Sequence, residues 1–201
     1  MKNNISKDSY FLIGIVASAG GPSTLKSLFT KIRNDIKTPI IVSQHMPDGF
    51  KQGLVDWLKS ETGKSIKTAE NGELIKKGRI YFPPDGFHIE VKGKRIVLSN
   101  SPPVKGIRPS GDLLLKSLAK SFKDKAIGIV LTGMGSDGTE GMKNIFKVGG
   151  TTIAQTPRSA KMLSMPENAI SSGSVKYIFT LDEIADFLSK LEGEYESINC
   201  G

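Results

Sequence analysis

Three short segments of the chain contain the residue types that nucleophilic acyl transfer needs. Ser18 precedes a Gly-Gly-Pro turn, His45 precedes a Met-Pro pair, and Asp137 lies in a glycine-rich loop. A serine hydroxyl attacks a carbonyl carbon when a histidine takes its proton and a carboxylate fixes the histidine tautomer. Each residue follows an apolar run typical of a strand, and sites form beyond the carboxyl ends of parallel strands. We therefore predict Ser18 as nucleophile, His45 as base and Asp137 as the orienting carboxylate.

Backbone N–H groups near Ser18 supply a second component of such a site. N–H groups at a helix start lack intrahelical partners and carry partial positive charge. We expect those of Ala19 and Gly20 to face an oxyanion that forms when Ser18 attacks a carbonyl. Met134, in the loop before Asp137, can add its own N–H.

Each of these residues also has a structural alternative. Ser18 fits a helix N-cap or a phosphate-binding turn. His45 fits a hydrogen-bonded structural histidine, and Asp137 fits the N-cap of a helix that starts near Thr139. His88, in a predicted hairpin strand, is the second candidate for the base.

We expect mostly structural roles for residues 108–112 and 164–166. Ser110 or Asp112 is expected to cap the following helix, and Arg108 to bind an acidic group. Met165, in a loop that enters a helix, is expected to pack in the interior.

Apolar runs alternate with amphipathic stripes along most of the chain. The predicted strands are 11–16, 39–42, 126–131, 151–154 and 175–179, and helical spacing of apolar residues follows them. Thr180 and Glu183 form a capping box before the last helix. Between Ile66 and Asn100 the segments are short and β-like, with a hairpin around Gly93. We predict an α/β fold: a doubly wound, mostly parallel sheet flanked by helices, with an inserted antiparallel β-hairpin.

Composition excludes several classes of function. The 201 residues include 28 Lys and Arg against 20 Asp and Glu, giving a net charge of +8, which is compatible with an anionic partner. The lysines are dispersed and no aromatic residues alternate with them, so we expect no nucleic-acid binding. One cysteine and two histidines are too few for a disulfide, a cysteine cluster or a three-histidine zinc site. We expect no metal and no cofactor, and the absence of a Walker motif argues against an NTPase.

No apolar run reaches the roughly 20 residues that span a bilayer, so we expect no membrane insertion. Residues 17–19, Ala-Ser-Ala, fit the cleavage pattern of a secretory signal. The preceding flank is polar and carries Asp8, and the apolar run is short and contains Gly14. We therefore predict a first β-strand there and a cytoplasmic protein.

Taken together, the motifs resemble the catalytic domain of the chemotaxis protein-glutamate methylesterase family. The resemblance rests on residues 13–22 (IGIVASAGGP), 44–50 (QHMPDGF) and 131–138 (LTGMGSDG). Weaker similarities occur at residues 81–88, 108–110, 154–155 and 165–166. The resemblance implies that Ser18, His45 and Asp137 are catalytic and that the Met134 N–H stabilises the oxyanion. It also implies hydrolysis of glutamate γ-methyl esters on chemoreceptor helices, with release of methanol, and deamidation of receptor glutamines.

Three positions depart from the family pattern. Ala19 replaces the usual threonine, residues 156–158 (Thr-Pro-Arg) lack the usual acidic residue, and Ser164 replaces the glycine of Gly-Met-Pro. These departures bear on substrate choice and turnover more than on reaction type. Family members usually begin with a receiver domain, and none is expected here. We expect a flexible arm at 1–10, a catalytic domain at 11–192 and a flexible tail at 193–201, in a shortened chain or in a stand-alone enzyme with a separate regulatory protein.

Two other classes of function remain open from the sequence. The glycine-rich helix start and the positive charge fit a non-catalytic phosphate- or nucleotide-binding module. Ala19 and Arg158 fit a degenerate domain that binds acidic receptor helices without turnover.

Overall fold

The computed structural model describes residues 11–199. The arm expected at residues 1–10 and the terminal residues 200–201 lie outside the described residues. Seven parallel strands form one sheet in the order β3-β4-β2-β1-β7-β8-β9. The strands are β1 (Leu12–Ala17), β2 (Ile40–Gln44), β3 (Ile66–Thr68), β4 (Ile80–Phe82), β7 (Ala126–Val130), β8 (Thr151–Gln155) and β9 (Tyr177–Phe179).

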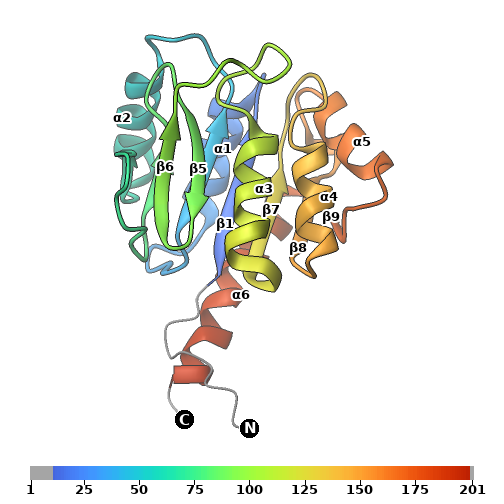
Figure 1. Ribbon diagram of the computed structural model, residues 1–201. Coiled ribbons are helices and arrows are strands. Elements are labelled where there is room, and N and C mark those ends of the chain that lie inside the picture. Colours follow the sequence, from blue (N-terminus) through green and yellow to red (C-terminus); the bar gives the residue numbers. More distant parts are fainter. Residues whose placement is uncertain (1–10, 200–201) are drawn as a thin grey trace, which may run out of the picture.

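Helices cover both faces of this sheet. One face packs against α1 (Gly21–Lys31), α2 (Lys51–Thr62) and α6 (Leu181–Asn199). The other packs against α3 (Gly111–Phe122), α4 (Thr139–Lys147), α5 (Ser164–Ser171) and the antiparallel hairpin of β5 (His88–Lys92) and β6 (Arg95–Ser99). Figure 1 shows α3, α4 and the hairpin on the near face of the sheet. The predicted doubly wound α/β fold with an inserted hairpin is confirmed.

The residues of β1 show why the sheet needs two cores. Ile13 and Ile15 belong to the core beneath α1, whereas Leu12 and Val16 belong to the core beneath α3. This alternation follows from the two-residue period of a strand whose two faces are both buried. Gly14 faces α3, where an added Cβ would lie 2.7 Å from Leu115 Cδ2. The glycine therefore lets α3 pack closely on the strand.

The structure differs from the predicted elements in two places, one in strand pairing and one in the end of a helix. β3 and β4 come from the short β-like segments predicted around the antiparallel hairpin, but they do not pair with it. They pair in parallel with each other, and β4 pairs with β2, at the edge of the main sheet. The last helix extends beyond its predicted end, because α6 continues over 193–199, part of the expected tail. The predicted capping box at its start is confirmed, with Glu183 N–H donating to Thr180 Oγ1 at 3.3 Å and Thr180 N–H donating to Glu183 Oε2 at 2.7 Å.

The three segments that carry the candidate residues leave adjacent strands. β1 lies between β2 and β7. The chain leaves β1 into α1 on one face and leaves β7 into α4 on the other. A reversal of this kind opens a crevice outside the strand ends, which is where α/β sheets bind ligands.

Candidate active site

Strand register brings Ser18 and His45 to neighbouring positions. Ala17 pairs with Gln44 at the ends of β1 and β2, so the next residues of the two strands, Ser18 and His45, face each other. The His45 N–H donates to Ala17 O at 2.9 Å, and the Ser18 N–H donates to Thr132 O at 3.0 Å. These bonds continue the pairing of β1 with its two neighbouring strands by one residue. They fix the backbone positions of Ser18 and His45.

The Gln44 side chain links the same two residues. It is 3% exposed, and its Nε2 donates to Ser18 O at 2.9 Å and to His45 O at 2.7 Å. Gln44 belongs to the QHMP motif, but no local residue pattern indicates this bridging role. Its amide acts as a brace between the nucleophile segment and the base segment.

His45 and Asp137 form the central pair of the site. His45 Nε2 lies 2.8 Å from Asp137 Oδ2, and the two side chains are 12% and 7% exposed. The carboxylate accepts, so Nε2 carries a proton and the lone pair of a neutral ring is on Nδ1. No described residue bonds to Nδ1. Nδ1 is therefore available to accept a proton, as a general base requires.

The Asp137 carboxylate accepts four hydrogen bonds. Besides His45, the donors are Ser110 Oγ at 3.0 Å, the Gly111 N–H at 2.5 Å and the Asp112 N–H at 3.0 Å. Burial raises the pKa of the Asp137 carboxyl, but the hydrogen bonds from His45, Gly111 and Asp112 outweigh it and keep the pKa below its usual value. The carboxylate is thus ionised and fixed in place.

The bonds of Asp137 differ from its structural alternative. The N-cap of α4 is Gly138, with φ of 93°, and no side chain caps that helix. Asp137 instead accepts N–H groups from the first turn of α3, a long-range contact that helix-cap patterns do not encode. Ser110 is the N-cap of α3, and its hydroxyl oxygen accepts the Leu113 N–H. Of the two caps predicted for this helix, Ser110 or Asp112, the structure has Ser110.

Asp112 has a different role from Ser110. Its Oδ1 accepts the Gly141 N–H at 3.0 Å, which ties α3 to α4. Burial raises the pKa of the Asp112 carboxyl, and the nearby Asp137 charge raises it further, while the Gly141 N–H opposes this shift. The guanidinium of Arg108, predicted to bind an acidic group, donates instead to the backbone carbonyls of Asn100 and Ser101.

The Ser18 hydroxyl makes no hydrogen bond within the part of the chain that the structure describes. The direct serine–histidine bond that completes a triad is therefore not closed, although Ser18 and His45 are register neighbours. Such bonds are commonly long in a substrate-free site and shorten when substrate binds. The structure brings Ser18, His45 and Asp137 together at one rim but closes only the His45–Asp137 contact.

The predicted oxyanion donors lack acceptors. Between residues 11 and 199, nothing accepts a hydrogen bond from the N–H of Ala19, Gly20 or Met134. Gly20, with φ of 80°, is the N-cap of α1 and has no side-chain cap. Uncommitted N–H groups of this kind can bind a developing negative charge.

Gly133 lies where the nucleophile loop meets Met165. A Cβ added at Gly133 would fall 2.1 Å from Met165 Sδ and 2.8 Å from Ser18 Cβ. Only glycine fits this contact without displacing the nucleophile. Met165 is fully buried, so its predicted packing role is confirmed.

Thr132 and Gln155 have a structural role that the motifs containing them do not indicate. The Thr132 hydroxyl donates to Ala19 O at 3.0 Å and accepts the Met162 N–H at 2.8 Å. Gln155 Oε1 accepts the Thr132 N–H at 2.9 Å. Both side chains are fully buried. They connect the loops after β1, β7 and β8 into one framework around the site.

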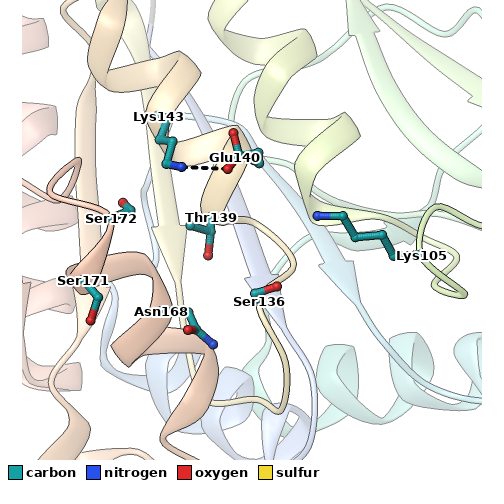
Figure 2. Close-up of a pocket in the computed structure, with 8 residues that line it drawn as sticks. All are labelled: Lys105, Ser136, Thr139, Glu140, Lys143, Asn168, Ser171 and Ser172. Carbon is teal, nitrogen blue, oxygen red and sulfur yellow. Dashed lines mark hydrogen bonds and ion pairs between the residues drawn. The ribbon is translucent and has the colours of Figure 1, made fainter.

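An open hollow of about 280 Å³ lies beside the Asp137 loop (Figure 2). Its lining is polar and contributed by α4, α5 and two loops: Lys105, Ser136, Thr139, Glu140, Lys143, Asn168, Ser171 and Ser172. Glu140 pairs with Lys143 at 2.7 Å.

No group of three His, Cys, Asp or Glu side chains suited to a metal ion occurs among residues 11–199. Over the same range, no helix has the length and hydropathy that crossing a membrane requires.

Comparisons with known proteins show the family of this chain. A family model described as CheB methylesterase matches residues 13–188. The chain is 39% identical over 181 residues to a Rhizobium meliloti protein named protein-glutamate methylesterase/protein-glutamine glutaminase of group 3 operon, covering 90% of this chain and 51% of that protein. It is 39% identical over 190 residues to a Clostridium acetobutylicum protein-glutamate methylesterase/protein-glutamine glutaminase, covering 94% and 55%.

A solved structure matches the fold over nearly its whole length. The Thermotoga maritima CheB methylesterase catalytic domain superimposes with a TM-score of 0.88 at 34% identity, covering 91% of this chain and 99% of that one. The chain spans about half the length of the curated relatives it matches.

Proposed function

Because this chain belongs to the CheB methylesterase family, we propose that it is a serine hydrolase that demethylates glutamate γ-methyl esters on chemoreceptor proteins and releases methanol. The hydrogen bond between His45 and Asp137, beside the register position of Ser18, is the observation that carries the proposal. The names of the relatives support hydrolysis and also glutamine deamidation. They do not support a non-catalytic phosphate- or receptor-binding module.

The proposed reaction begins when Ser18 Oγ attacks the ester carbonyl carbon. His45 Nδ1 takes the hydroxyl proton, and the Asp137 carboxylate stabilises the resulting imidazolium through Nε2. The carbonyl oxygen becomes an oxyanion that the N–H groups of Ala19, Gly20 and Met134 are available to bind. A positioned base contributes about 10²–10⁴ in rate, and removal of a single oxyanion donor costs about 10²–10³ in kcat.

The second half of the cycle returns the enzyme to its starting state. When the tetrahedral intermediate collapses, the carbon–oxygen bond to the methoxy group breaks and His45 gives its proton to that group, so methanol leaves. Water then attacks the acyl-serine with His45 as base, and a glutamate carboxylate and free Ser18 are formed. With a glutamine side chain the same steps release ammonia.

The proposed partners are the methylated cytoplasmic helices of chemoreceptors, and we propose a cytoplasmic location together with them. The net charge of +8 favours encounter with an acidic helical target. A separate regulatory protein is a further proposed partner. The charge steers association more than it defines the target sequence.

The decisive experiment measures methanol release from a methylated receptor fragment by the 201-residue protein. Ser18→Ala should lower the rate by about 10⁴-fold or more, because the nucleophile is lost, while the circular dichroism spectrum stays unchanged. Ser27→Ala, on the same helix that follows Ser18 but away from the strand end, is the matched control and should retain full activity.

Undiminished methanol release by Ser18→Ala would defeat the assignment. Receptor binding without methanol release, even at a large excess of wild-type protein, would favour a non-catalytic receptor-binding domain. Strongly salt-dependent nucleotide binding with no reaction of Ser18 toward a phosphonate would favour the phosphate-binding alternative.

A further inference from the structure

Four hydrogen bonds attach the loop that carries Met134 to the start of α5. Gly133 O accepts the Met165 N–H at 3.1 Å and the Ser164 hydroxyl at 3.3 Å. The Gly135 N–H donates to Ser164 Oγ at 3.0 Å, and Asn168 Nδ2 donates to Gly135 O at 2.9 Å. The loop is therefore fixed on both sides of Met134, while Met134 itself takes no part in these bonds.

Ser164 has a special position in this set. Its hydroxyl donates to Gly133 and accepts from Gly135, so one oxygen bridges the two residues that flank Met134. Both flanking residues are glycines, and Gly135 has φ of 90°. Glycine backbones have a wide range of accessible dihedral angles. Without external bonds, this segment would sample several orientations.

The bonds to Gly133 O also determine where the Met134 N–H points. The carbonyl of Gly133 and the N–H of Met134 belong to the same planar trans peptide unit, in which the two groups point in opposite directions. When Ser164 and Met165 bind the carbonyl on the α5 side, the N–H must point away from α5. That N–H finds no acceptor among the described residues, so it remains available.

We propose that Ser164 is a positioning residue that aims the Met134 N–H at the oxyanion, with Asn168 as a weaker second support. The inference rests on the proposed ester hydrolysis. Figure 2 shows Asn168 on α5 beside the loop that carries Ser136, the residue that follows Gly135. Preorganised donors stabilise a transition state without reorganisation at the moment of reaction, so a loosely held donor is a poorer catalyst.

The test compares Ser164→Ala, Ser164→Thr and Ser171→Ala in methanol release by the 201-residue protein. Ser164→Ala should lower kcat about tenfold with KM nearly unchanged, because the Met134 N–H binds charge that exists only in the transition state. Ser164→Thr retains a hydroxyl and should restore most of kcat. Ser171→Ala, on the exposed part of the same helix, is the matched control and should behave as wild type.

A second variant keeps the proposal testable if Ser164→Ala is poorly folded. Asn168 is exposed and its side chain makes one bond to the loop, so Asn168→Ala should fold and lower kcat by about threefold, again without a change in KM.

Unchanged kcat in folded Ser164→Ala, or an equal loss in Ser171→Ala, would overturn the positioning role while leaving the hydrolase assignment intact. A rise in KM with constant kcat would also overturn it, since that pattern indicates uniform substrate binding. If wild type releases no methanol and Ser18→Ala behaves identically, the proposed function itself fails.

Discussion

The two histidines of this protein lie in contrasting surroundings. His45 is 12% exposed at the rim of the main sheet, with Nε2 on Asp137 and no described partner on Nδ1. His88 is fully buried in the hairpin; its Nδ1 accepts the Ser110 N–H at 3.0 Å and its Nε2 lies 3.3 Å from Pro102 O. A general base must present a lone pair to the substrate. Exposure and partners, rather than residue type, separate the candidate base from a structural histidine.

The two regions are nevertheless connected. His88 binds the Ser110 backbone, the Ser110 hydroxyl donates to Asp137, and Asp137 binds His45. His88, the second candidate base, contacts Asp137 only indirectly, through Ser110. A buried histidine with both nitrogens engaged stabilises the segment that orients the candidate triad.

The largest expected difference is in turnover after equivalent substitutions of the two histidines. His45→Gln should lower kcat by about 10²–10⁴-fold, because glutamine cannot accept the Ser18 proton. Thermal stability should change little, since Asp137 keeps its bonds from Ser110, Gly111 and Asp112. Methanol release and thermal unfolding check the two halves of this prediction. A His45→Gln protein with near wild-type turnover would remove His45 from the proposed mechanism.

His88→Gln should show the opposite pattern. The substitution disturbs two buried hydrogen bonds, so the free energy of unfolding should fall by about 1–3 kcal/mol. Turnover below the unfolding transition should drop only a few fold, through displacement of Ser110. Urea unfolding followed by circular dichroism measures the first effect. If folded His88→Gln lost turnover as completely as His45→Gln, the distinction between the two sites would collapse.

The smallest expected effect concerns acid stability and the Asp137 carboxylate that joins the two regions. Its folded-state pKa lies below the ordinary value of 3.8. This shift contributes stability above about pH 4 that is lost as pH falls through the folded-state pKa, because the unfolded chain binds the proton more readily. Asp137→Asn should therefore flatten the acid limb of the stability–pH curve, measured by urea unfolding between about pH 5 and pH 2.

Asp112 provides the matched control with the opposite sign. Burial raises the pKa of its carboxyl above 3.8. The folded state therefore binds this proton more readily, and Asp112 lowers stability as pH rises through that range. Asp112→Asn should make the acid limb steeper. A flatter limb in both variants would contradict the assigned pKa directions.

Local sequence was sufficient to predict most elements and the three candidate residues. The ends of four strands lie within two residues of their predicted positions: β1, β2, β7 and β8. Their bounds could be predicted because a strand buried on both faces is a continuous apolar run, and the turns that end it are rich in glycine. Ser18, His45 and Asp137 could be selected because each follows such a run. The short strands β3 and β4 could not be assigned to a sheet from local pattern, since a strand of three residues fits either edge of the fold.

The sequence by itself determined which strand ends carry a hydroxyl, an imidazole and a carboxylate. Only the tertiary structure decided what each group contacts: Asp137 binds the first turn of α3 rather than capping α4, His88 lies behind it, and Ser164 bridges the loop around Met134. Residue patterns report backbone preferences over a few neighbouring positions. Contacts between segments 25 or more residues apart, such as Asp137 with Asp112, depend on strand order and helix packing, which no short pattern contains.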